Sequence, residues 1–229
     1  MDRVPVELAV AVPLGWSRRT SRIRRYDEYF RKVVSRLKSS PLHAVTITRN
    51  YQKNSIELGD AILSDTSPLL TEDVHLVAVS NVVSHFGAIV FAGLNNPTLA
   101  EVFVNTYRNA VPLDGVREYV RRYAPTEPFV TLSSKQPRKL VLYTGEGTCT
   151  FERSEDVYGV TLVSDAEYLD TLEPTEVLFG TSARWNAPPY SLVFLDVTDY
   201  TPVLLAEELK IPLESSREVH YNKPIEPRR

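Results

Sequence analysis

The side chains best suited to do chemistry are the nine basic residues between positions 17 and 38, where only Asp27 and Glu28 are acidic. Seven of the nine are arginines, and the planar guanidinium group donates paired hydrogen bonds to phosphate. At 100° per residue, four of these side chains project within about 40° of one another on a helix. The pattern predicts a nucleic-acid-binding surface, to which we assign Arg18, Arg22, Arg25, Lys32 and Arg36.

The same basic segment has other interpretations. A solvated helix face would show the same sequence pattern if acidic neighbours in the same fold paired with its basic residues. Residues 1–53 carry a net charge of +8, and the rest of the chain carries −11, so such neighbours are available. An anionic membrane or a protein partner is a third interpretation, although an aromatic and β-branched apolar stripe is more typical of a core-facing helix than of a lipid-inserting one. The uneven charge indicates a polyanion partner or head-to-tail contacts between subunits.

A second basic cluster follows at residues 114–123. Arg117 and Arg121 are one turn apart and share a helix face, with Tyr119 and Tyr123 alongside. Aromatic rings beside arginine can stack on exposed bases, but aromatic residues on a short helix also form cores. We assign Arg117 and Arg121 to nucleic-acid binding as well.

Residues 183–192 predict a protein contact. Trp185 and Tyr190 flank two prolines in a predicted loop, and a rigid loop with large aromatic side chains loses little entropy on binding. The alternative is that Trp185 folds back onto the sheet. The polar C-terminal segment ends in two arginines, and we assign Arg228 to the same contact class.

No reaction can be assigned from the sequence, and no catalytic residue, cofactor or metal ligand is predicted. The Gly-x-Gly of residues 144–148 lies between two strand-like segments, which predicts a hairpin turn rather than a phosphate loop. Acidic residues from Asp60 to Asp73, with His75, would suit a metal, but near a helix start they more often interact with the helix dipole. Cys149 is the only cysteine, and the four histidines have no metal-site spacing.

Hydrophobic periodicity predicts the elements that position these residues. Residues 4–14 alternate as a strand, and residues 18–38 form a helix that buries Ile23, Tyr26, Phe30, Val33, Val34 and Leu37. Two strands within 43–63, a helix over 71–87 and a strand over 88–94 follow. This order is that of a split βαβ, ferredoxin-like unit.

The rest of the chain changes character. Two short helices are predicted over 95–110 and 114–123, and from Glu127 to Leu213 short strands alternate with turns, as in an antiparallel sheet. The predicted class is α+β, with a domain boundary near residue 125 that separates 1–125 from 126–229. One continuous domain is the alternative.

Composition favours a soluble, intracellular protein, or one inside a particle assembled in the cell. Hydrophobic residues make up 43% and charged residues 24%. No stretch reaches the roughly 18 apolar residues of a membrane span, and the first residues lack a secretory signal. We expect a non-enzymatic, homo-oligomeric structural protein that binds nucleic acid, RNA slightly preferred, by analogy with viral nucleoproteins, coat and matrix proteins. The alternatives are a metal-dependent RNA-processing hydrolase and a protein-interaction module without nucleic acid.

Overall fold

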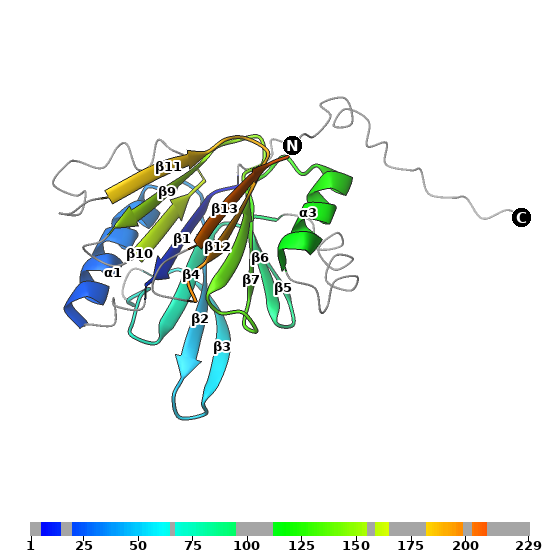
Figure 1. The fold of residues 1–229 in the computed structure, drawn as a ribbon. Coiled ribbons are helices and arrows are strands. Elements are labelled where there is room, and N and C mark those ends of the chain that lie inside the picture. The colour runs from blue at the N-terminus through cyan, green and yellow to red at the C-terminus, as the bar shows by residue number, and fades with distance from the viewer. Residues whose placement is uncertain are drawn as a thin grey trace, which may run out of the picture.

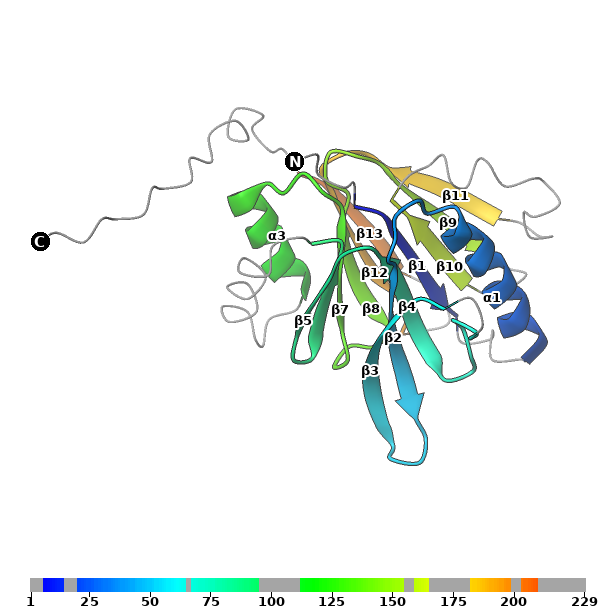
Figure 2. The same cartoon turned by 180° about the vertical axis from the view of Figure 1, so that it is seen from behind.

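The computed structural model describes residues 6–14, 20–64, 67–94, 112–154, 159–164, 182–198 and 203–209. In this part of the chain two antiparallel sheets pack face to face, and one helix covers the outer face of each sheet (Figure 1 and Figure 2). The layers run from helix α1 (Thr20–Ser35) through the two sheets to helix α3 (Pro112–Tyr123). The predicted α+β class with mainly antiparallel strands is confirmed.

The first sheet has seven strands, in the order β11 (Ser182–Ala187), β9 (Cys149–Ser154), β10 (Gly159–Val163), β1 (Leu8–Pro13), β4 (Val74–Ser80), β2 (His43–Asn50) and β3 (Ser55–Ile62). The second sheet has six strands, in the order β13 (Val203–Glu208), β12 (Ser191–Asp196), β8 (Lys139–Tyr143), β7 (Phe129–Ser133), β6 (Ile89–Ala92) and β5 (Val83–Phe86).

Side-chain alternation along the strands builds three apolar layers. On β1, Leu8, Val10 and Val12 join the cluster between the two sheets, whereas Ala9 and Ala11 join the cluster under α1. Successive side chains of a strand point to opposite faces of a sheet. A central strand is therefore apolar on both faces, and the small residues lie where the helix approaches. The third cluster lies between the second sheet and α3.

Helix α1 confirms the predicted helix but ends at Ser35 rather than at residue 38, and all six residues of the predicted apolar stripe are buried. Tyr26 anchors the helix most deeply. Its hydroxyl donates to the carbonyl of Val160 at 2.6 Å and accepts from the amide of Val12 at 3.2 Å. A Cβ atom at Gly159 would lie 2.3 Å from the Tyr26 ring, so only glycine permits this approach.

The helix predicted over 71–87 is wrong. This segment forms β4 and β5, which belong to different sheets, and every residue of β4 is buried. Its β-branched valines are stiff at χ1 and pack well on both faces of a central strand. Without this helix the predicted ferredoxin-like unit is not confirmed. The two strands predicted within 43–63 are confirmed as β2 and β3.

Two further predictions concern chain connections. Both sheets take strands from each side of residue 125, because β1 pairs with β10 and β6 pairs with β7. The domain division there stays a prediction. The hairpin predicted at 144–148 is wrong, because this turn connects β8 of the second sheet to β9 of the first. The helix predicted over 95–110 lies outside the described residues.

Candidate nucleic-acid interface

Helix α1 presents a row of basic side chains on the side opposite its buried stripe. Arg25, Lys32 and Arg36 are exposed, as the periodicity predicts, and Arg22 is half-buried. With a rise of 1.5 Å per residue, the row from Arg25 to Arg36 extends roughly 16 Å along the helix axis. Arg18 lies outside the described residues.

The members of this row differ in how they are engaged. No hydrogen bond or ion pair engages the Arg25 side chain in the part of the chain that the structure describes. Arg22, Lys32 and Arg36 each interact with other groups of the chain. Arg25 is therefore the most available cation of the row, whereas the other three would have to exchange an existing interaction for a phosphate.

The opposite flank of α1 is built from ion pairs. Arg24 bonds Glu28 at 3.1 Å in an exposed pair, and Arg31 bonds Asp27 at 3.0 Å. Asp27 is buried, and its other oxygen accepts the amides of Leu69 and Leu70 at 2.7 and 2.8 Å. Sequence reasoning missed this anchor, although Asp27 falls between Ile23 and Val34 on the apolar stripe. A charged residue in such a stripe was the available signal.

A second buried carboxylate fixes the flank of α1 next to the basic row. Glu152 of β9 is 1% exposed. One of its oxygens accepts the Tyr29 hydroxyl at 3.1 Å, and the other accepts Nε of Arg184 on β11 at 2.7 Å. Burial, and then the charge of Glu152, raise the pKa of Tyr29 above its ordinary range. This network brings Arg184 beside α1, a cation that the sequence did not indicate.

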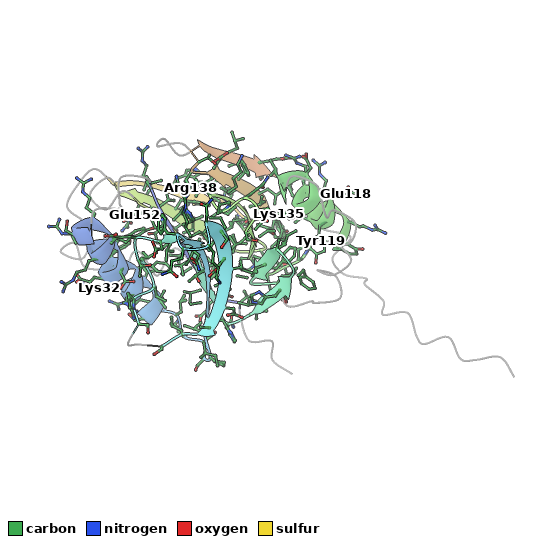
Figure 3. All side chains as sticks on the ribbon, turned by 90° about the horizontal axis from the view of Figure 1, so that it is seen from below. Lys32, Glu118, Tyr119, Lys135, Arg138 and Glu152 are labelled. Carbon is green, nitrogen blue, oxygen red and sulfur yellow. The ribbon has the colours of Figure 1, made fainter. Side chains whose placement is uncertain are left out.

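The two predicted basic clusters lie on opposite sides of the molecule. Figure 3 shows Lys32 on α1 and Glu152 on the sheet side of that helix, whereas Glu118 and Tyr119 of α3 lie at the far end of the view. Between the two helices lie both sheets. The clusters therefore cannot form one continuous surface.

On α3 the predicted binding residues are paired within the fold. Arg117 donates through Nε to Glu207 of β13 at 2.7 Å and through a terminal nitrogen to Asp114 at 2.5 Å. Arg121 contacts the other oxygen of Glu207 at 3.3 Å. The hydrogen bond to Glu207 raises the pKa of Arg117. These contacts attach α3 to the edge strand β13, and the assignment of Arg117 and Arg121 to nucleic acid stays a prediction.

The tyrosines of α3 belong to its core. Tyr119 is 4% exposed, and its ring lies against Phe129 and Tyr123, with centroids 6.1 and 5.1 Å away. Burial raises the pKa of Tyr119 to about 12. A ring packed in this way has no free face for a nucleic-acid base, so Tyr119 matches the core interpretation.

The predicted protein-contact residues lie in different environments. Trp185 is part of β11 rather than of a loop, and its ring centroid is 5.1 Å from that of Phe151. Tyr190 occupies the turn before β12 with a φ of 57°, half-buried against the cluster under α3. A bulky residue at positive φ is unusual. Arg228 lies outside the described residues, and the contact role of all three stays a prediction.

Three of the histidines lie in two further groups of polar side chains. Asp60 contacts His85 at 2.8 Å and His43 at 3.6 Å. His75 is the extra residue of a bulge in β4, between Val74 and Leu76, and Arg138 of the β7–β8 turn lies 3.4 Å from its Nδ1. Across the described residues, no group of three or more histidine, cysteine or acidic side chains is arranged to hold a metal ion.

No known protein-family model matches this sequence, and no curated protein resembles it significantly. Among the helices described, neither is long and apolar enough to cross a membrane.

Proposed function

We propose that the chain is a non-enzymatic, self-associating structural protein that binds nucleic acid through the basic face of α1, formed by Arg22, Arg25, Lys32 and Arg36. The observation that carries the proposal is the exposed row of Arg25, Lys32 and Arg36 on a helix held from below by buried contacts. Because Tyr26, Asp27 and Tyr29 fix the helix, its cations have a fixed spacing before any ligand binds. Preorganised donors lose less entropy on binding.

The charge distribution gives the proposal its second support. Residues 1–53 carry +8 in a chain whose total charge is −3, and nine of the twelve basic residues of this segment lie between positions 17 and 38. Arg184, drawn beside the helix by Glu152, adds a further cation to this side. Phosphate contacts of this kind give sequence-independent affinity, as expected of a protein that coats a nucleic acid.

The test is the salt dependence of binding. For a single-stranded RNA probe, the logarithm of affinity should fall linearly with the logarithm of salt, by about 0.7 per phosphate contact. The double variant Arg25→Gln with Lys32→Gln should flatten the slope by about 1.4 units, the value for two contacts. The matched control is the double variant Arg122→Gln with Lys135→Gln, which makes the same charge change on exposed residues elsewhere. The control should keep the slope.

Three outcomes would overturn parts of the proposal. If the α1 double variant keeps both affinity and slope, the basic face is only the solvated side of a helix. If both double variants lose the same amount, binding depends on net charge and not on α1. If the probe is cleaved when magnesium is added, the protein is not a simple binding protein.

A further inference from the structure

One sheet edge, that of β3, is long and regular, and the carboxylates of its two charged residues, Glu57 and Asp60, are engaged within the subunit. The described edges are β11 and β3 of the first sheet and β13 and β5 of the second. β5 has only four residues, and β13 and β11 have six each. β3 spans eight residues with no lysine, arginine or proline, and its register with β2 is unbroken. Long, regular edges of this kind are templates for another strand.

Exposed apolar side chains follow this edge. Ile62 at the end of β3 is 67% exposed, and Ile56 and Leu58 are half-buried at the rim of the central cluster. On the outer face, an open groove of about 290 Å³ runs along β2 and β3, lined mainly by small and apolar residues. The β2–β3 hairpin extends beyond the rest of the sandwich in Figure 1 and Figure 2, so the edge can be approached.

The residue pattern of β3 is self-complementary in one register. Two copies related by a two-fold axis pair antiparallel, and one residue then faces itself. An axis at Glu57 or Asp60 would place two carboxylates opposite each other, which is destabilising. An axis at Leu58 would place Ile62 beyond the partner strand, opposite Asn54 of the turn. An axis at Gly59 places Ile62 opposite Ile56 twice, which covers the most exposed apolar side chain.

We propose that β3 pairs with β3 of a second copy of this chain about a two-fold axis at Gly59, so that the two first sheets become one continuous antiparallel sheet. In this register Glu57 faces Ala61 of the other copy and Leu58 faces Asp60. The proposal rests on the self-association in the proposed function and names its interface.

The charge of Asp60 does not oppose this pairing. Its carboxylate contacts His85 of β5 at 2.8 Å and His43 of β2 at 3.6 Å, so it is engaged within its own subunit. The same contacts connect β3 to β5, the edge strand of the second sheet. They hold β3 in position for the approach of a partner strand.

Disulfide trapping tests the register. Directly opposed residues have Cα atoms about 4.5–5.5 Å apart, which suits a disulfide. The double variant Glu57→Cys with Ala61→Cys should give a covalent dimer on mild oxidation. Either single variant should give little, because four residues, roughly 13 Å, would separate its two thiols. Cys149, the only native cysteine, is buried, and burial raises the pKa of its thiol, so it should not interfere.

Sizing by light scattering after nuclease treatment tests the interface in solution. Ile62→Lys should raise the dimer dissociation constant at least about tenfold, because it replaces two apolar pairs with two charges. Leu205→Lys is the matched control, since Leu205 is 55% exposed on the edge strand β13. It should leave the dimer intact and keep the wild-type melting temperature, whereas Ile62→Lys should match the wild type only at protein concentrations at which both are monomeric.

The interface is overturned if the wild-type protein is monomeric at every concentration tested. It is also overturned if Ile62→Lys dimerises as the wild type does, or if a single-cysteine variant cross-links as well as the double variant. Nucleic-acid binding is measured in a separate experiment, by the dependence of RNA affinity on salt. A monomeric protein whose RNA affinity keeps the expected salt slope would contradict only the proposed interface. A trapped dimer that does not bind RNA would contradict only the proposed nucleic-acid binding.

Discussion

Helices α1 and α3 have the same design but differ in how far their basic side chains are exposed. Each packs an apolar stripe on the outer face of a sheet, and each carries arginines one turn apart. On α1 the arginine and lysine row points into solvent, whereas on α3 both predicted binding arginines contact Glu207. The basic pattern of a helix therefore does not tell whether its cations serve a ligand or the fold.

The neighbouring strands make the difference. Beside α3, the edge strand β13 presents Glu207 at a partly exposed position within reach of Arg117 and Arg121. Beside α1, the carboxylates of Asp27 and Glu152 are buried, and backbone amides and the Tyr29 hydroxyl use part of their bonding capacity. The fold should consequently depend on the arginines of α3 more than on the exposed row of α1.

The largest expected effect lies in the buried stripe of α1. Phe30→Ala should lower the free energy of unfolding by about 3–5 kcal/mol, because Phe30 is fully buried and its loss leaves a cavity. Lys32→Ala, two residues away and exposed, should change it by less than about 0.5 kcal/mol. Urea unfolding measures both. Equal effects would contradict the separation of the helix into an anchored face and an exposed face.

The apolar stripe of α1 was predictable because six large side chains repeat with a 3.6-residue period and no other element fits them. Residues 71–87 were not, because a short segment rich in valine satisfies both a helix and a buried strand. The segment forms a strand because β4 is buried on both faces. This burial depends on pairing with strands β1 and β2, which are distant in the sequence.

The candidate site was predictable only in part, for a related reason. Exposure of Arg25 follows from local periodicity. The engagement of Arg117 depends on Glu207, which lies 90 residues later, and that of Arg184 depends on a strand pairing. Such pairings require the topology of the sheets, which the sequence did not reveal.

Asp27 gives the next effect. Asp27→Ala should cost about 2–3 kcal/mol, because the amides of Leu69 and Leu70 and the guanidinium of Arg31 lose a charged acceptor. The control is Glu28→Ala, which removes the neighbouring carboxylate from an exposed pair and should cost less than about 0.5 kcal/mol. If the two variants unfold at the same urea concentration, Asp27 does not anchor the helix.

A direct comparison of one arginine from each helix should give a smaller difference. Arg117→Gln should lower the free energy of unfolding by about 1 kcal/mol, since a partly exposed guanidinium loses two carboxylate partners. Arg25→Gln should leave stability within about 0.5 kcal/mol of the wild type. Thermal melts of the two variants, made side by side, measure this. A larger loss for Arg25→Gln would mean that the α1 row serves the fold.

The smallest expected effect comes from making α3 resemble α1. Glu207→Gln removes the charge that engages Arg117 and Arg121, but Asp114 still holds Arg117, so one arginine becomes available. The slope of RNA affinity against salt should steepen by about 0.7, the value for one added phosphate contact on a single strand. Glu208→Gln, an equal charge change at the next, exposed residue, should leave the slope unchanged. Equal steepening in both variants would show that net charge alone sets binding. No change in either would mean that a released arginine on α3 finds no phosphate.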